Sequence, residues 1–270
     1  MSVQEKMPVL FIGHGSPMNL IEDNPWTKEW ERMEKMVPKP KAILMISAHW
    51  FAKTTALQSD ENPAMIYDMY GFPDPIYELK YPASTSKELI GRVQELLGDK
   101  VVLQGDRGYD HGAYAPLLKM YPEATIPVVQ LSVNYKLNAR EWFEIGQLLS
   151  PLREEGVLIM GSGDIVHNLR LINPSMGNTP LPEAEAFEET LLRKIDPAQE
   201  NDLKGALNWE SLPGARVAAE HPDHLAPLFY CLGAVLGQGN VDELQLQPYG
   251  IGAHDYVWGS LSMTSLSWGL

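Results

Sequence analysis

The feature that most constrains the fold is a short apolar run that ends abruptly at a glycine turn carrying a histidine. The run covers residues 8–12, and the turn is Gly13-His14-Gly15-Ser16-Pro17. An apolar run of this length, bounded by turn residues, predicts a buried strand. Glycines on both sides let the backbone bend sharply and let other groups approach His14 closely. A histidine placed in this way is a candidate site residue.

The residues that follow this turn predict a strand–helix–strand unit. Asn24 and Pro25 are typical of a helix start, and apolar residues then recur at helical spacing as far as residue 37. A second apolar run, residues 42–48, leads into His49. Such a crossover makes the two strands parallel, so their carboxyl ends lie at one edge of the sheet. We therefore expect His14 and His49, just past those ends, to lie close together.

Three further histidines stand beside a glycine turn or a helix start. They are His111 in Asp110-His111-Gly112, His167 shortly after the strand 156–160 and its Gly161-Ser162-Gly163 turn, and His224, predicted in the first turn of a helix capped by Asp223. Each buried imidazole needs a hydrogen-bond partner, so the convergence of four or five on one sheet edge is hard to explain by packing. Clustered imidazoles are typical ligands of divalent transition metals.

Strands alternate with helices along the rest of the chain. Further strands are predicted at 54–58, 101–103, 126–133 and 256–266, and further helices at 86–97, 138–149, within 182–219 and at 225–236. This alternation predicts an α/β fold with a mostly parallel or mixed central sheet and helices on both faces. With no linker or repeat in the sequence, we expect residues 1–270 to form a single domain. The Pro- and aromatic-rich segment 70–81 is expected to be an ordered loop that covers the site or packs on the core.

Composition limits the classes of partner and compartment. The net charge of −14 and the lack of a basic stripe argue against nucleic acid. Cys231 is the single cysteine, which excludes a disulfide or a cysteine metal cluster within one chain and favours a reducing compartment. No apolar run reaches the roughly 20 residues that span a bilayer, and residues 1–6 do not resemble a signal peptide. We expect a cytoplasmic protein with no membrane partner; an oligomer is left open.

The serines in the glycine turns do not predict a nucleophile. Neither Ser16 nor Ser162 lies in a Gly-x-Ser-x-Gly elbow, and the turn around Ser162 lacks the Lys of a phosphate-binding loop. Of the remaining histidines, His221 is expected to pack at a helix start and His254 to lie on a surface loop.

Several of these motifs, taken together, resemble one family. They are Gly13-His14-Gly15-Ser16-Pro17, Ser47-Ala48-His49-Trp50, Tyr70-Gly71-Phe72-Pro73, Asp110-His111-Gly112 and the segment from Gly161 to Leu169. Their order and content are similar to those of the DOPA-dioxygenase-like proteins, within the class III (LigB-type) extradiol ring-cleavage dioxygenases, the superfamily of the protocatechuate 4,5-dioxygenase catalytic subunit. The resemblance covers nearly the whole chain.

The resemblance implies a non-haem Fe(II) oxygenase. His14 and His49 match the two metal-binding histidines, and His224 matches the third ligand of the DOPA-dioxygenase branch. His167 matches a residue that serves in the family as an acid/base or as a further ligand, and His111 matches the other active-site histidine. The wider superfamily usually has a glutamate as third ligand. All-nitrogen coordination also attracts Zn(II), so we expect Fe(II) for activity and either zinc or iron in the purified protein.

The function implied is insertion of O₂ into a small, L-DOPA-like catechol, with the ring opened beside the diol. His167 is then expected to remove a catechol proton, because a neutral imidazole suits a general base, and His111 to protonate or position oxygen. Two alternatives stay open. A zinc-dependent hydrolase could use the same histidines with a bound water, and a non-enzymatic binding protein could keep the same fold.

Overall fold

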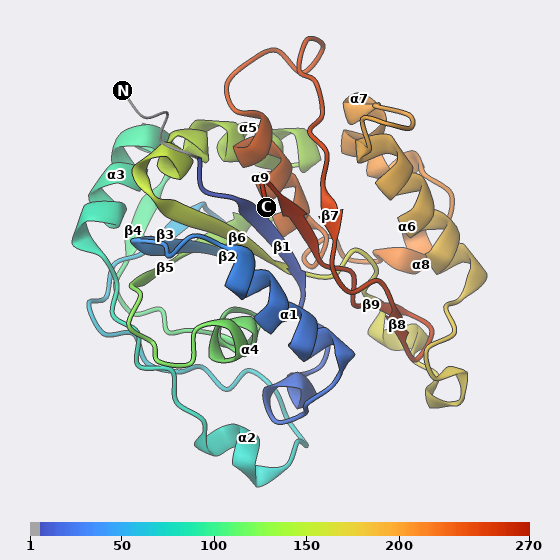
Figure 1. Cartoon of the computed structure of the whole chain (residues 1–270), viewed down its shortest axis with the longest axis horizontal. Coiled ribbons are helices and arrows are strands. Elements are labelled where there is room, and N and C mark those ends of the chain that lie inside the picture. The colour runs from blue at the N-terminus through green and yellow to red at the C-terminus, as the bar shows by residue number, and fades with distance from the viewer. Residues whose placement is uncertain (1–5) are drawn as a thin grey trace.

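A computed structural model describes residues 6–270, so the expectation about a signal peptide falls mostly outside the described residues. The centre of the molecule is an eight-stranded sheet with the order β4-β3-β5-β2-β6-β1-β10-β7 (Figure 1). Its strands are β1 (Val9–Gly13), β2 (Ala42–Ala52), β3 (Ala56–Gln58), β4 (Val102–Gln104), β5 (Val128–Asn134), β6 (Val157–Gly163), β7 (Gly250–Ile251) and β10 (Leu266–Trp268). A separate pair is formed by β8 (Tyr256–Val257) and β9 (Leu261–Ser262).

The four central strands of this sheet run parallel. β6 lies between β1 and β2 and pairs with both of them in parallel, and β2 pairs in parallel with β5. The predicted crossover from β1 to β2 is thereby confirmed, together with the shared edge at their carboxyl ends. The flanks are mixed, because β3 is antiparallel to β5 and β10 is antiparallel to β1.

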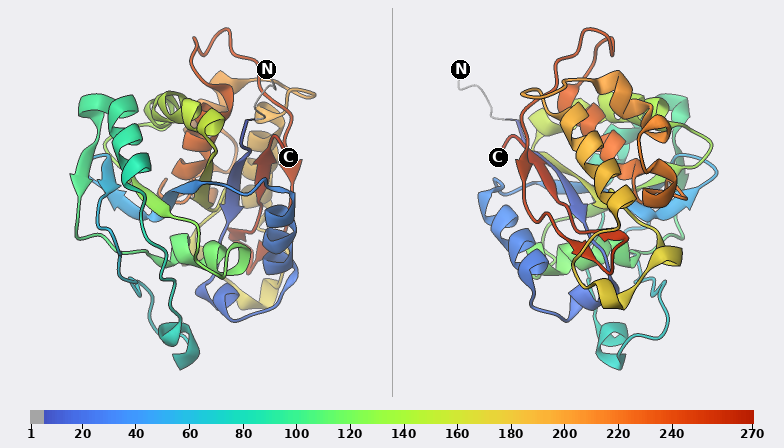
Figure 2. Two further views of the ribbon diagram at one scale, coloured as in Figure 1. Left: turned by 60° about the vertical axis from the view of Figure 1, so that its left-hand side comes forward. Right: turned by 90° about the vertical axis from the view of Figure 1, so that its right-hand side faces the viewer.

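Helices cover both faces of the sheet (Figure 2), as predicted for an α/β fold. They are α1 (Pro25–Met36), α2 (Asp74–Glu78), α3 (Lys87–Leu97), α4 (His111–Met120), α5 (Ala139–Leu149), α6 (Pro182–Ile195), α7 (Leu203–Leu207), α8 (Ala215–Ala218) and α9 (Ala226–Leu236). None of the helices in the described part of the chain is both long and apolar enough to span a membrane.

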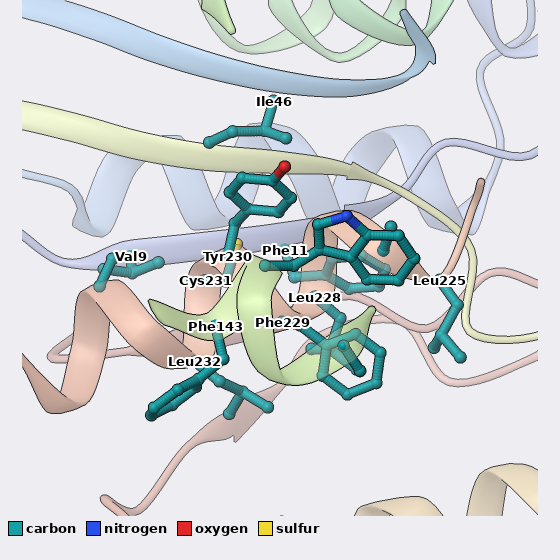
Figure 3. Packing of buried hydrophobic residues seen from close by; sticks show 14 of the residues in the cluster. Val9, Phe11, Ile46, Phe143, Leu225, Leu228, Phe229, Tyr230, Cys231 and Leu232 are labelled. Atoms are coloured by element: carbon teal, nitrogen blue, oxygen red, sulfur yellow. The ribbon is translucent and has the colours of Figure 1, made fainter. Parts of the chain in front are cut away.

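Alternate residues of each central strand enter different cores. Val9 and Phe11 pack with α3, α5 and α9 in the larger core, part of which is shown in Figure 3. Leu10 and Ile12 face the opposite way and pack with α1 and α4. This division follows from the period of two along a strand. It also explains why β1 and the first residues of β2 and β6 are apolar on both faces: both faces are buried.

Side-chain caps begin α1 and α5 where the sequence predicted helix starts, and a cap that was not predicted begins α4. Asn24 caps α1 in a capping box with Thr27, and Asn138 caps α5 in a capping box with Glu141. Asp110 caps α4 by accepting a hydrogen bond from the backbone amide of Ala113. These caps satisfy backbone amides that have no partner within the helix. The cap at Asp110 makes His111 the first residue of its helix.

Two predicted strands differ from the structure. His49 lies inside β2 and not beyond it, because the strand continues past an irregularity between Ser47 and Phe51. Such a bulge changes the direction in which a side chain points. The predicted strand 256–266 is broken into β8, β9 and the start of β10, because Trp258 and Gly259 have positive φ angles of 52° and 85° and reverse the chain. The predicted loop 70–81 contains the short helix α2.

Candidate metal centre

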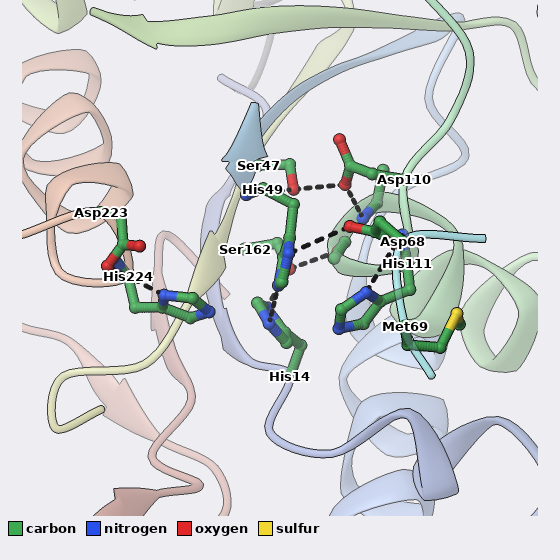
Figure 4. Close-up of polar contacts among 12 residues, drawn as sticks. His14, Ser47, His49, Asp68, Met69, Asp110, His111, Ser162, Asp223 and His224 are labelled. Atoms are coloured by element: carbon green, nitrogen blue, oxygen red, sulfur yellow. Dashed lines mark hydrogen bonds and ion pairs between the residues drawn. The ribbon is translucent and has the colours of Figure 1, made fainter. Parts of the chain in front are cut away.

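Histidines from distant parts of the chain converge at the carboxyl edge of the central strands. His14 follows β1, His49 lies in β2, and His224 precedes α9. One ring nitrogen from each lies within 4.8 Å of the others. Figure 4 shows these rings pointing toward a common region, with His111 beside them. The predicted convergence of these histidines is confirmed.

His14 and His49 approach each other through their Nε2 atoms, which are 3.1 Å apart. The Nδ1 atom of His14 lies 3.0 Å from the hydroxyl oxygen of Ser162. That hydroxyl donates its own proton to the carbonyl oxygen of Gly112, so it must accept from His14 Nδ1–H. The proton of His14 is therefore on Nδ1, and the lone pair of Nε2 is directed at the space shared with His49.

The separation of these nitrogens suits a shared cation. Two nitrogen ligands at about 2.0–2.1 Å from a tetrahedral ion lie about 3.4 Å apart. His14 and His49 are inclined by 50°, His14 and His224 by 50°, and His49 and His224 by 86°. Rings inclined in this way can direct their in-plane lone pairs at one point. The donor set therefore fits a divalent transition metal.

His224 is held by its backbone, close against the end of β6. The amide of Asp164 donates to the carbonyl oxygen of His224 over 3.0 Å, and a Cβ at Gly163 would lie only 2.0 Å from the same oxygen. Asp223 Oδ1 lies 3.1 Å from His224 Nδ1. The predicted cap is wrong: α9 begins at Ala226, and Asp223 accepts instead from the amide of His224.

Neither ring nitrogen of His224 makes a well-directed hydrogen bond to any described residue. The residue is buried, so its nitrogens are also shielded from solvent. Buried polar atoms are nearly always satisfied by a partner, and an exception points to a missing ligand, water or ion. The unsatisfied nitrogens of His224 therefore fit a cation bound between His14, His49 and His224.

Asp68 contacts the rings of both His49 and His111. Its Oδ1 lies 2.8 Å from His111 Nδ1, and its Oδ2 lies 3.1 Å from His49 Nδ1. The ring centroids of His49 and His111 are 3.9 Å apart. Asp68 could not be identified from the sequence, because it lies outside any periodic segment. The motif that follows it, Tyr70-Gly71-Phe72-Pro73, was the nearest signal.

Asp110 and Gly112 bring α4 against the site. Asp110 accepts from the hydroxyl of Ser47 over 2.6 Å and from Arg107 over 2.6 Å. Gly112 leaves room for the strand, since a Cβ there would lie 2.5 Å from Ser47 Oγ and 2.7 Å from a ring carbon of His49. These contacts fix the start of α4, and therefore His111, relative to β2.

His167 lies on the far side of His224. The two rings stack with their centroids 3.5 Å apart and their planes 4° from parallel. Asp164, also near these rings, is buried. Its Oδ1 accepts from the amide of Gly15 over 3.1 Å, and its Oδ2 has no partner among the described residues. Asp164 lies within the motif from Gly161 to Leu169, and nothing in the sequence indicated a role for it.

Burial keeps most of these imidazoles neutral. It lowers the pKa of His14 and of His224 well below the usual value, and repulsion between the rings adds to the effect. Burial also lowers the pKa of His111 and lowers that of His167 to about 4. His49 differs: burial opposes its charge, but its hydrogen bond to Asp68 and the nearby carboxylates raise its pKa. Neutral imidazoles are the form that binds metals.

These shifts predict that the metal-free protein loses stability in mild acid. Four rings have a lowered pKa in the folded protein: His14, His111, His167 and His224. Below the unfolded histidine pKa of about 6.5, these residues bind protons in the unfolded chain but not in the folded protein. Each such ring lowers the free energy of unfolding by up to about 1.4 kcal/mol per pH unit, between its unfolded and its folded pKa. His49 behaves in the opposite way. Because its pKa is raised in the folded protein, protonation of His49 stabilises the fold, and this stabilisation is lost as the pH rises through the folded pKa.

We expect the urea midpoint of the chelator-treated protein to fall steeply between about pH 7 and pH 5. The variant His254→Ala should show the same pH dependence, because its ring is exposed outside the cluster. His14→Gln should show a shallower one. A wild-type midpoint that stays constant over this range would contradict the assignment of neutral, buried rings.

The two remaining histidines do not join the cluster. His221 is exposed, contrary to the expectation that it packs at a helix start. His254 lies on an exposed loop, as predicted, and its Nδ1 is 3.0 Å from the hydroxyl of Thr264. All five histidines brought together by the structure are those that the sequence analysis selected.

Comparison with known proteins gives the family. Residues 8–259 match the model of the catalytic LigB subunit of aromatic ring-opening dioxygenase. The 4,5-DOPA dioxygenase extradiol of Escherichia coli (strain K12) is 39% identical over 269 residues, covering 98% of this chain and 95% of that protein. The protein of the same name from Beta vulgaris is 39% identical over 272 residues, covering 94% and 96%.

A solved structure agrees with these relatives. The crystal structure of an uncharacterized protein from Escherichia coli K12 matches with a TM-score of 0.81 and 36% sequence identity, covering 97% of this chain and 99% of that one. The resemblance inferred from the motifs around His14, His49 and His167 is thereby confirmed. The chain belongs to the aromatic ring-opening dioxygenase family of the catalytic LigB subunit, a family of ring-cleaving oxidoreductases.

Proposed function

We propose that this enzyme is an Fe(II)-dependent extradiol dioxygenase that opens the ring of a small, L-DOPA-like catechol beside its diol. The observation that carries the proposal is the cluster of ring nitrogens from His14, His49 and His224, all within 4.8 Å of one another. Relatives that bear the name 4,5-DOPA dioxygenase extradiol support the substrate class. A catechol carries two adjacent oxygens, which can bind one metal ion together.

His14, His49 and His224 would hold the ion. When bound, divalent iron would supply the Lewis acidity and the one-electron chemistry through which dioxygen reacts with an aromatic ring. The same three nitrogens are attractive to Zn(II), whose affinity for such ligands exceeds that of Fe(II). We therefore expect activity with iron, and an inactive zinc form when zinc is abundant during purification.

We assign His167 as an acid/base residue and not as a further ligand. Lone pairs of an imidazole lie in the ring plane, and the planes of His167 and His224 are nearly parallel at a centroid distance of 3.5 Å. Two such planes share no nearby point, so one ion cannot lie in both. Burial lowers the pKa of His167 to about 4, so the ring is neutral and has a lone pair that can accept a catechol proton.

His111 would act on the other side of the ring cluster. Its Nδ1 is directed at Asp68, so Nε2 is the nitrogen available for oxygen or substrate. The ring is buried and its pKa is lowered, chiefly by burial, so it would act as a neutral hydrogen-bonding group. His111, the first residue of α4, thus lies beside His49, and His167, which follows β6, lies beside His224.

The function is tested by anaerobic reconstitution of the chelator-treated enzyme with Fe(II), followed by oxygen consumption with L-DOPA and with simple catechols. We expect uptake of one O₂ per catechol and a coloured, ring-opened product, with no uptake in the zinc-loaded enzyme. Zinc-dependent hydrolysis without oxygen uptake would establish the hydrolase alternative instead. A chain that binds neither metal would point to a non-enzymatic binding protein.

A further inference from the structure

Asp68 occupies an unusual position, between two imidazoles that come from different elements. His49 belongs to β2 and His111 begins α4, whereas Asp68 lies in neither. It lies just before the segment 69–81, which contains α2 and projects from the body of the molecule (Figure 2). Tyr70 in this segment is 90% exposed. The carboxylate itself is largely enclosed, with a side chain that is 21% exposed.

Each oxygen of Asp68 contacts one of the two rings, and Oδ1 also accepts a hydrogen bond from the backbone of His111. Oδ1 lies 2.8 Å from His111 Nδ1 and also accepts from the His111 amide over 3.1 Å. Oδ2 lies 3.1 Å from His49 Nδ1. The amide of His111 is one of those that a helix leaves without an internal partner. The carboxylate is therefore anchored to the start of α4 while it reaches across to β2.

An ionised carboxylate only accepts hydrogen bonds. Each Nδ1 that contacts it must then carry a proton, and each neutral ring must keep its lone pair on Nε2. We propose that Asp68 is a positioning residue that sets the tautomer and the orientation of His49 and His111 together. The inference rests on the proposed function, because Nε2 of His49 is a proposed ligand atom and Nε2 of His111 is the proposed contact to oxygen or substrate.

The other rings show that this arrangement is specific to one pair. His14 obtains the same tautomer from the hydroxyl of Ser162, a group that serves no second ring. A single carboxylate that serves two rings couples a proposed ligand to a proposed catalytic residue. Loss of the carboxylate should therefore disturb metal binding and turnover at once, although Asp68 would contact neither the ion nor the substrate.

Asp68→Asn gives the sharpest test. An asparagine side chain has one accepting oxygen and one donating nitrogen in the same place. One ring can keep its proton on Nδ1 against the oxygen. The other must either move its proton to Nε2, which removes the lone pair needed there, or turn away. The change in volume is small, so the fold should be retained, which a thermal melt would verify.

The primary measurement is ¹⁵N NMR of the metal-free protein with labelled histidine, at a pH above the pKa values of both rings. In the wild type we expect both His49 and His111 to carry the proton on Nδ1. In Asp68→Asn we expect one of them to carry it on Nε2. Titration with Zn(II) should show an affinity lowered about 10–100-fold, the usual cost of losing a partner of a metal-binding histidine. Asp68→Glu, which keeps the carboxylate, should restore the Nδ1–H tautomers.

Asp74→Asn is the matched control, since Asp74 is an exposed carboxylate in the same segment. It should leave both tautomers and the affinity unchanged. A proton on Nε2 of either ring in the wild type, or an Asp68→Asn variant with unchanged tautomers and affinity, would overturn the proposal. These readouts need neither iron nor a catechol, so they separate this inference from the proposed dioxygenase activity, whose failure would appear as absent oxygen uptake by the wild type.

Discussion

Replacement of His14 or His49 with alanine is expected to abolish stable metal binding and, with it, ring-opening activity. Each change removes one of three nitrogen donors from the cluster in which His14 Nε2 and His49 Nε2 are 3.1 Å apart. The loss in affinity should exceed the roughly 10–100-fold that removal of an outer partner costs. Metal content by mass spectrometry after reconstitution, together with calorimetric titration, measures both effects.

Each of these variants should stay folded. Neither His14 nor His49 belongs to the two apolar cores, so the loss of one ring is expected to leave the fold intact. His254→Ala is the matched control, because its ring is exposed on a loop. It should retain full metal content and turnover. If His14→Ala and His49→Ala both kept stoichiometric metal, these ligand assignments would be wrong.

Replacement of His167 or His111 with alanine is expected to separate catalysis from metal binding. His167 stacks on His224 in nearly parallel planes and His111 lies against Asp68, so neither is needed to complete the cluster of His14, His49 and His224. Loss of a general acid or base typically costs about 100- to 10,000-fold in rate. We expect kcat with L-DOPA to fall within that range while most of the metal is retained.

Steady-state oxygen consumption, with metal content measured on the same samples, distinguishes the two effects. His221→Ala is a suitable control near the site in sequence, because its side chain is exposed and outside the cluster. Near-normal kcat in His167→Ala would disprove its role as the base. A loss of metal in His167→Ala that matches the loss in His14→Ala would instead make His167 a ligand.

Much of the arrangement could be predicted from sequence because it depends on connection rules. The crossover between β1 and β2 must be of the parallel type, which places His14 and His49 at one edge. The caps Asn24 and Asn138 mark helix starts through local hydrogen bonds that involve only neighbouring residues. Helix caps depend on a few neighbouring residues, and the parallel crossover depends on the order of strand and helix. Both can therefore be recognised in the sequence.

Other parts of the site depend on contacts between distant segments and leave no such pattern. Asp68 meets His111 across 43 positions, and nothing periodic surrounds it in sequence. The turn that breaks the closing strand depends on a positive φ at Trp258, a residue that rarely adopts one. Asp223 looked like a helix cap, but the chain makes one more turn before α9 begins. Tertiary contacts decide all three.

The close approach of His224 to β6 limits which residues can replace Gly163 during evolution. Gly163 contributes no functional group, yet any larger residue there would push the His224 backbone outward, because even a methyl group would lie 2.0 Å from its carbonyl oxygen. The position of the proposed third donor thus depends partly on the absence of a side chain at Gly163. A descendant that acquired a side chain at this position would have to recruit its third ligand from elsewhere.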